Sequence, residues 1–313
     1  MSETNVKVLF LAGWGRSGTT IIDNILGEID GFFSVGELYH LWGRGLVQER
    51  RCGCGVPPRQ CETWQAVLAR AFGHSEAPDA KRFHRLALTC TRTRHLLAHM
   101  RGRCEAPAEY RDALARLYRA IPDVTGSRVV VDSTKHPAYA SVLGDVPGVD
   151  LRVVHIVRDP RAVAYSWLRK KVQLDEARPR YMRSHGALYS AVMWDLLNLT
   201  TERLWRRPGA PYLLVRYEDF VRNPREIIQN VVDFAGEPEA TLPFRSERSV
   251  VLSGNHTISG NPSRFQTGLV EIEPDDEWLM RMRRRDEWVS TGSTLPFLKH
   301  FGYPIRIHSR TSG

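Results

Sequence analysis

Long apolar runs are missing from this sequence: none approaches the roughly 20 residues that a helix needs to cross a bilayer. The first apolar segment, residues 6–12, is too short for a signal peptide and leads directly into glycine and arginine. Cysteine is also sparse, and five residues, an odd number in 313, fit a reducing compartment better than a disulfide framework. We therefore expect a cytoplasmic protein without a membrane span, folded as a single domain over residues 1–313.

Lysine is scarce as well, because 38 of the 44 basic residues are arginine. The net charge of +9 would suit a polyanionic ligand, since arginine binds phosphate through a bidentate fork. Nucleic acid is not the expected polyanion: the arginines are scattered, without an RNA-binding aromatic signature, a zinc finger or a basic helix. The longest basic run, residues 283–285, is interpreted as a solvated helix face. The preference for arginine over lysine is typical of a GC-rich bacterial genome.

Short Val- and Ile-rich segments alternate with segments of helical spacing along most of the chain. The expected strands are 6–12, 32–35, 128–131, 151–157 and 212–215, and the expected helices are about 160–172, 186–205, 224–236 and 275–285. This alternation predicts an α/β fold with a phosphate-loop type of parallel sheet flanked by helices. Residues 41–125 are rich in Arg and Ala and predict a mainly helical insertion. Residues 238–270 predict a loop that covers the cofactor or substrate.

The glycine-rich turn after the first strand keeps the spacing of an ATP-binding phosphate loop but lacks its lysine. Thr19 stands where that lysine is expected, and the cation has moved into the loop as Arg16. Backbone N–H groups at the start of the following helix would still bind a phosphate, with hydroxyl groups added by Thr19 and Thr20. A turn that binds nothing is the alternative, and we favour it less because the motif directly follows a strand.

The missing lysine also argues against a kinase of nucleotides or small molecules, which we keep as the alternative enzyme class. Asp132 ends a strand, as the magnesium-binding acid of such enzymes does, but the nearby Lys135 would compete with a metal for its carboxylate. Transfer of a group with less negative charge than a phosphoryl group needs no such metal in principle, because fixed arginine and amide donors can stabilise that charge. We therefore expect no metal requirement.

Two motifs resemble the superfamily of sulfotransferases that use 3′-phosphoadenosine-5′-phosphosulfate (PAPS). Residues 16–20 resemble its 5′-phosphosulfate motif, in the arginine form of carbohydrate and tyrosyl-protein sulfotransferases. Residues 156–167 resemble its 3′-phosphate motif, in which an Arg at a strand end and a Ser eight residues later hold the phosphate. Arg158 and Ser166 have that spacing, although an Arg-Asp-Pro-Arg turn alone is more often only a helix start. The resemblance implies a cofactor-binding set of Arg16, Ser17, Gly18, Thr19, Thr20, Arg158 and Ser166.

Three further stretches support the resemblance, which covers about residues 6–270. Residues 131–135 resemble a Val-Asp-Ser-Ser-Lys element, and residues 215–220 resemble a Tyr-Glu-Asp-Leu segment. Residues 259–265 resemble a Gly-Asn-Pro-x-Arg-Phe element of bacterial members, which implies that Arg264 contacts the adenosine or the 3′-phosphate. The implied reaction is transfer of a sulfuryl group from PAPS to a hydroxyl of a small-molecule, carbohydrate or glycolipid acceptor.

An acceptor hydroxyl must lose its proton to a base as it attacks sulfur, and two residues compete for this role. The resemblance favours Glu37, which follows a predicted strand as the base does in carbohydrate and tyrosyl-protein members, with Arg16 assisting the leaving group. His40, three residues later, could share a helical face with Glu37, and steroid-type members use a histidine. A glutamate that merely stabilises a helix start is the structural alternative. Lys135 could assist, although a lone lysine after a strand is more often a surface ion-pair partner.

Three of the five cysteines gather in the insertion, at positions 52, 54 and 61. Their spacing suggests a zinc site, but no fourth ligand is obvious, although His40 or His74 could serve. The interpretation we prefer is that this segment packs the insertion, with Trp64 as its anchor. An exposed Cys-x-Cys pair could also oxidise.

Overall fold

A parallel five-stranded sheet forms the centre of the molecule, which a computed structural model describes for residues 5–73, 79–176 and 180–306. Its strands follow the order β2-β3-β1-β4-β7, and every neighbouring pair is parallel. They are β1 (Val6–Ala12), β2 (Phe32–Gly36), β3 (Val129–Lys135), β4 (Val149–Val157) and β7 (Tyr212–Arg216). All five expected strands are present, and the α/β fold class is confirmed.

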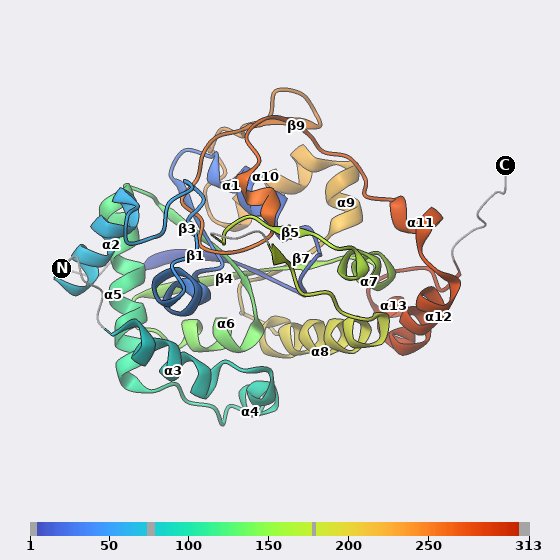
Figure 1. The fold of residues 1–313 in the computed structure, drawn as a ribbon, viewed down its shortest axis with the longest axis horizontal. Coiled ribbons are helices and arrows are strands. Elements are labelled where there is room, and N and C mark those ends of the chain that lie inside the picture. The colour runs from blue at the N-terminus through green and yellow to red at the C-terminus, as the bar shows by residue number, and fades with distance from the viewer. Residues whose placement is uncertain (1–4, 74–78, 177–179, 307–313) are drawn as a thin grey trace.

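Both faces of the sheet are covered, and the alternation of side chains along β1 shows how. Val8 and Phe10 enter a core shared with the insertion, whereas Leu9 and Leu11 enter a second core on the opposite face. Figure 1 shows α5, α6 and α8 on one side of the sheet and α1, α9 and α10 on the other. The helices of the chain up to residue 234 that lie outside the insertion are α1 (Thr19–Gly27), α6 (Pro137–Gly144), α7 (Pro160–Leu168), α8 (Ala187–Trp205), α9 (Tyr217–Arg222) and α10 (Pro224–Phe234). None of the helices in the described ranges is long and apolar enough to cross a membrane.

The expected insertion is mainly helical, as its composition predicts. A π-helical turn at Leu41–Val47 precedes α2 (Glu62–Phe72), α3 (Ala80–Cys90), α4 (Leu96–Met100) and α5 (Ala108–Thr125). Trp42 in this turn stacks on Phe83 with 4.9 Å between the ring centroids. Trp64 is fully buried, and its indole N–H donates to the carbonyl of His256 (2.7 Å), so this tryptophan anchors the insertion as expected.

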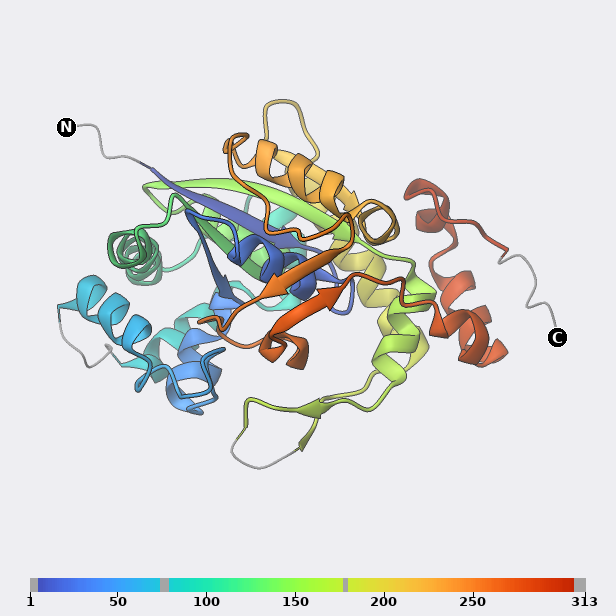
Figure 2. The same cartoon turned by 90° about the horizontal axis from the view of Figure 1, so that it is seen from above.

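The helix expected at residues 160–172 ends at Leu168, because ion pairs draw the next residues away from it. Arg169 has an extended backbone, and its guanidinium pairs with Asp275 (3.1 Å) and Glu277 (2.5 Å). The chain then forms a short antiparallel pair, β5 (Val172–Gln173) and β6 (Arg180–Tyr181). Figure 2 shows this pair as an arm that projects from the body of the molecule.

Two other expected segments also differ from the structure. The helix expected at 275–285 is broken, because Met282 has an extended backbone and packs into a cluster with Trp278. The elements here are α11 (Glu277–Arg281), α12 (Arg284–Ser293) and α13 (Leu295–His300). The segment 238–270 is not loop throughout: it contains an antiparallel pair, β8 (Ser249–Leu252) and β9 (Gly268–Glu271), which crosses in front of the sheet in Figure 2.

Asp132 is fully buried in β3, and its carboxylate faces α5. The backbone N–H of Thr134 donates to one carboxylate oxygen (2.8 Å), and the hydroxyl of Tyr118 donates to the other. Burial raises the pKa of Asp132 to about 6, against the stabilising effect of these donors. Its hydrogen-bonding capacity is thus used within the fold, between β3 and α5.

We predict that Tyr118→Phe lowers the free energy of unfolding by about 1–3 kcal/mol, because a buried acceptor loses its donor. The loss should be larger at pH 8 than at pH 5, since the hydroxyl stabilises the ionised form of Asp132 and its removal raises that pKa further. Denaturant unfolding at both pH values measures this, with Tyr189→Phe as an exposed control. Equal and small losses in the two variants would contradict the prediction.

Candidate active site

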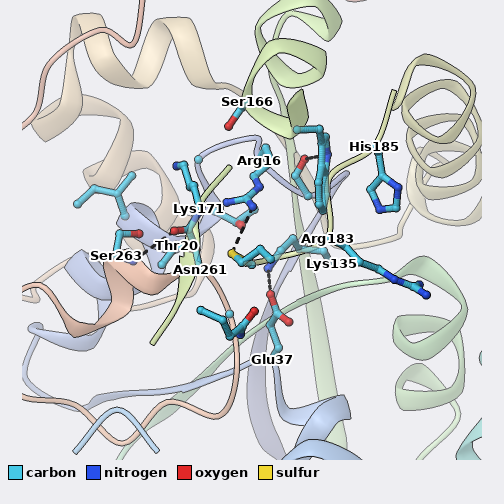
Figure 3. Close-up of a pocket in the computed structure, with 18 of the residues that line it drawn as sticks. Arg16, Thr20, Glu37, Lys135, Ser166, Lys171, Arg183, His185, Asn261 and Ser263 are labelled. Carbon is cyan, nitrogen blue, oxygen red and sulfur yellow. Dashed lines mark hydrogen bonds and ion pairs between the residues drawn. The ribbon is translucent and has the colours of Figure 1, made fainter. Parts of the chain in front are cut away.

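A cavity of about 850 Å³ opens at the carboxyl ends of the parallel strands. Figure 3 shows side chains from the first turn, β2, β3, α7 and the β5–β6 arm converging on it. Seven of the residues expected at the site line this cavity: Arg16, Gly18, Thr19, Thr20, Glu37, Arg158 and Ser166. Segments far apart in the sequence therefore meet at one edge of the sheet.

The turn between β1 and α1 has the features of an anion site. Gly18 has a φ of 88°, and a Cβ there would collide with the ring of Tyr217, so only glycine fits. No side chain caps α1, which leaves the N–H groups of its first turn to a ligand. Arg16 Nε, Arg16 Nη1 and Ser17 Oγ are buried without a hydrogen-bond partner among the described residues. Such groups are rare in native proteins and are expected where a ligand binds.

The turn is held in place by α7. Trp167 donates its indole N–H to the carbonyl of Gly15 (3.1 Å), and its ring lies 4.8 Å from the guanidinium carbon of Arg16. Arg16 itself has a φ of 74°, a left-handed conformation that is uncommon for a residue with a side chain. Lys135, which also lines the cavity, has a φ of 73°. Backbone strain of this kind gathers at functional sites.

The second expected anion element starts at the end of β4. Arg158 is 5% exposed, lies 3.2 Å from the carboxylate of Asp275 and has Tyr217 under its guanidinium (4.4 Å to the ring centroid). Its Nη1 also donates to the carbonyl of Arg16 (3.3 Å), so the two arginines belong to one arrangement. Ser166, on α7, lines the same cavity.

The other charged residues of the Arg-Asp-Pro-Arg turn serve the fold. Asp159 caps α7 by accepting from the N–H of Arg161 (2.9 Å) and forms a buried ion pair with its guanidinium (2.6 Å). Arg161 also donates to the carbonyls of Pro304 and Ile305, which attaches the C-terminal segment to this helix. The turn is therefore both a helix start and the support of Arg158.

Glu37 lies at the cavity wall in an ion pair with Lys135 (2.7 Å), drawn as a dashed line in Figure 3. Burial alone would raise the pKa of Glu37, but Lys135, His40 and Arg44 together lower it to about 2. The carboxylate is thus ionised at neutral pH, because the nearby cations outweigh the effect of burial on its pKa. Lys135 is more than a surface partner, because its ammonium joins β3 to Glu37 inside the cavity.

His40 lies beside Glu37, with Nε2 3.4 Å from a carboxylate oxygen, but does not line the cavity. Burial and the nearby Arg44 lower the pKa of His40 to about 3, so its imidazole is neutral over the working range of most enzymes. A pH profile with a limb near 6–7 is therefore not expected from His40, and pH alone cannot separate the two candidate bases.

Several cavity residues were not recognised in the sequence. Arg44 and Lys171 line the cavity, and burial, followed by Arg16 and Arg169, lowers the pKa of Lys171 to about 8. Lysine is rare in this sequence, and this rarity could have drawn attention to Lys171 as a site residue. Lys171 falls instead inside the helix expected at 160–172. Nothing local distinguished Arg44 from its many neighbouring arginines.

Arg264, for which the resemblance implied a cofactor contact, does not line the cavity. Its buried guanidinium donates to the carbonyls of Thr257 (2.5 Å) and Arg51 (2.6 Å). Asn261 and Ser263 of the same element face the cavity in its place. The turn of this element therefore contributes to the cavity wall, and the buried Arg264 holds that turn in place.

Comparison with known proteins agrees with this arrangement of site and fold. Residues 9–241 match the profile of the Sulfotransferase family, which is most of the chain. The chain belongs to this sulfotransferase family. Human carbohydrate sulfotransferase 3 is 27% identical over 183 residues, covering 53% of the chain and 36% of the human protein. The mouse protein is 33% identical over 186 residues, covering 53% of the chain and 37% of the mouse protein, so the chain spans about a third of the length of these relatives.

Two solved structures share the fold of this sulfotransferase family member. The sulfotransferase domain of the Synechococcus PCC 7002 olefin synthase has a TM-score of 0.55 at 18% identity, covering 96% of each chain. The sulfotransferase domain of the curacin biosynthetic pathway has a TM-score of 0.54 at 15% identity, covering 97% of this chain and 99% of that one. The resemblance seen in the sequence motifs is thus confirmed at the level of family and fold.

We predict that Lys171 titrates near pH 8, below the ordinary lysine value of about 10.4, and that an anion in the cavity raises its pKa. Because the chain has only six lysines, NMR of isotope-labelled lysine side chains can follow each one. Lys171→Arg removes and so assigns the resonance. Titration of Lys171 near the ordinary lysine value of about 10.4 would show that its side chain is solvated rather than enclosed.

Proposed function

We propose that this protein transfers the sulfuryl group of PAPS to a hydroxyl of a small-molecule, carbohydrate or glycolipid acceptor. The observation that carries the proposal is that both expected phosphate elements line one cavity, together with a carboxylate that can accept a proton. The first turn, with Arg16, would bind the 5′-phosphosulfate, and Arg158 with Ser166 would bind the 3′-phosphate. The unpartnered donors of Arg16 and Ser17 support an anion at the first position.

The position of Asp132 argues against the kinase alternative. A phosphoryl-transferring enzyme of the phosphate-loop type needs an acid at the end of this strand to hold magnesium. Here that carboxylate is occupied by Tyr118 and the N–H of Thr134, and it does not line the cavity. Thr19 also stands in the place of the phosphate-binding lysine. Both essential parts of a kinase site are therefore missing from the described cavity.

The proposed reaction forms a bond between the acceptor oxygen and sulfur and breaks the bond between sulfur and the 5′-phosphate oxygen. Glu37 accepts the hydroxyl proton, and the N–H groups at the start of α1 together with Arg16 stabilise the leaving phosphate. Glu37 paired to Lys135 is a weak base. When the sulfuryl group arrives, its oxygens compete for the Lys135 ammonium, which raises the pKa of Glu37 towards a useful value.

The remainder of the cavity supports a polar acceptor. Its wall includes Arg44, Arg50 and Glu176, and Arg183 with His185 extends it beside the β5–β6 arm. Hydroxyl-rich ligands suit such a surface because each polar group of the wall can find a partner. The relatives named as carbohydrate sulfotransferases support the same class of acceptor.

Adenosine 3′,5′-bisphosphate, the desulfated product, should raise the melting temperature of the protein strongly. At 100 times its dissociation constant a ligand adds about 2.7 kcal/mol of stability. ATP with magnesium should add far less, because it offers no 3′-phosphate to Arg158 and Ser166. Thermal unfolding with each ligand measures the difference. A larger rise in melting temperature with magnesium-ATP than with the bisphosphate would favour the kinase alternative instead.

Arg158→Ala should weaken binding of adenosine 3′,5′-bisphosphate by about 2–4 kcal/mol, since a charge-assisted contact is lost. Adenosine 5′-phosphate, which lacks the 3′-phosphate, is the matched control ligand and should lose little affinity. Calorimetry with both ligands separates the roles of this residue. Equal losses for the two ligands would mean that Arg158 only supports the turn at Arg16.

Glu37→Gln should reduce turnover about 10²–10⁴-fold, the usual contribution of a general base, with little change in affinity for the bisphosphate. Glu37→Asp keeps a proton acceptor with a shorter reach and should retain more activity than the glutamine variant. Because Glu37 has a pKa of about 2, its ionisation gives no acid limb in kcat/KM between pH 5 and 8.

His40→Ala is the competing variant and should keep a measurable rate. If Glu37→Gln turns over within about threefold of wild type while His40→Ala is inactive, the base is His40. Sulfuryl transfer itself would survive that outcome, but the kinship of the mechanism with the carbohydrate and tyrosyl-protein branch would not.

A further inference from the structure

A cluster of sulfur and nitrogen atoms lies outside the cavity, where the insertion meets the segment after β8. Cys52, Cys54, Cys61 and His256 each offer one ligand atom, and all four atoms lie within 4.8 Å of one another. The fourth group is His256 and not His40, which lies beside Glu37; His74, the other candidate histidine, lies outside the described residues. The sequence did not reveal this fourth ligand, because His256 lies 195 positions after Cys61.

The distances in the cluster approach those of a tetrahedral zinc site. Bonds of about 2.3 Å to sulfur and 2.0–2.1 Å to nitrogen place two sulfurs about 3.8 Å apart and a sulfur and a nitrogen about 3.6 Å apart. The Sγ atoms of Cys52 and Cys61 are 3.9 Å apart, and Cys61 Sγ lies 3.2 Å from Nδ1 of His256. Small side-chain adjustments would bring all four atoms around one ion.

Hydrogen bonds fix the backbone around the cluster. The N–H of Cys52 donates to the carbonyl of Val56 (2.7 Å), and the N–H of Gly55 donates to the carbonyl of Cys52 (2.9 Å). These two bonds close a tight turn around Cys54. Gly53 donates to the carbonyl of Thr257 (2.9 Å), and a Cβ on Gly53 would collide with Asn255. The two segments are thus joined directly through their backbones, which holds the cysteines near His256.

We propose that Cys52, Cys54, Cys61 and His256 bind a structural zinc ion. Three thiolates and an imidazole are the ligand set of closed zinc sites, and soft sulfur ligands favour zinc over oxygen-seeking cations. A disulfide between Cys52 and Cys61 would use only two of the four groups and leave Cys54 and His256 without a role. Three thiolates leave the zinc site with one negative charge, and the buried Arg264 lies close enough to Cys52 and Cys54 to offset it.

The zinc would affect the active site indirectly, by fixing the segment that lies behind Glu37. Ile258 lies two residues after His256. Its N–H donates to the carbonyl of Val35 (2.8 Å), and its carbonyl accepts from the N–H of Glu37 (2.7 Å). The segment from His256 therefore extends the edge of the sheet beside β2, immediately behind Glu37. A metal that joins it to the insertion would fix this added strand and the turn with Asn261, without contacting the substrate.

The direct test is the metal content of the full-length protein, purified without chelators from zinc-supplemented cells. One zinc ion per chain is expected by mass spectrometry of the metal, and removal with a strong chelator should lower the melting temperature. Cobalt substituted for zinc should give the absorption bands of a tetrahedral thiolate site. None of these measurements depends on sulfotransferase activity, so they stand or fall separately from the proposed reaction.

Cys54→Ser is the most informative variant, because Cys54 is exposed and its replacement leaves the core intact. It should weaken zinc binding by more than about 100-fold, since even loss of an outer-shell partner weakens a site by 10–100-fold. Cys104→Ser, a cysteine outside the cluster, is the matched control and should keep the metal. Wild-type protein with no zinc and five titratable thiols, or with a Cys52–Cys61 disulfide, would overturn the proposal.

Discussion

Parallel pairing of β1 with β3 and β4 is the constraint on which the site depends. In a parallel sheet all carboxyl ends meet at one edge, so the residues that follow each strand converge without any local signal between them. The first turn follows β1, Lys135 ends β3, and Arg158 follows β4. Glu37 follows β2, which is separated from β1 by β3, and this order explains why its partner is Lys135 rather than Arg16.

The site concentrates positive charge that the protein alone does not neutralise. Arg16 keeps unpartnered donors, and Lys171 is buried enough to lower its pKa. Arg158 shares the carboxylate of Asp275 with Arg169, which also pairs with Glu277. Enclosed like charges raise the energy of the free protein and are relieved when a polyanion binds. A nucleotide with phosphate groups at two positions is the kind of ligand that relieves them together.

Support for the site comes from groups that never reach the cavity. Arg161 and Asp159 hold the start of α7, and Arg264 holds the turn that carries Asn261 and Ser263. Buried ion pairs of this kind contribute little net stability, but they define one geometry because unpaired alternatives are costly. A zinc ion bound by Cys52, Cys54, Cys61 and His256, as we propose, would likewise fix the segment behind Glu37.

Strand and turn motifs were predictable from the sequence, because the alternation of Val-rich strands and the glycine turn are local patterns with local causes. They determined the sheet, the phosphate loop and the placing of Arg16, Arg158 and Glu37 at its edge. Tertiary structure alone decided the rest. Ion pairs of Arg169 ended α7 early and turned Lys171 into the cavity, and the environment of Arg264 directed it away from the cavity. His256 joined three cysteines only because a distant segment pairs with β2, and no local pattern encodes a contact set by the packing of the whole chain.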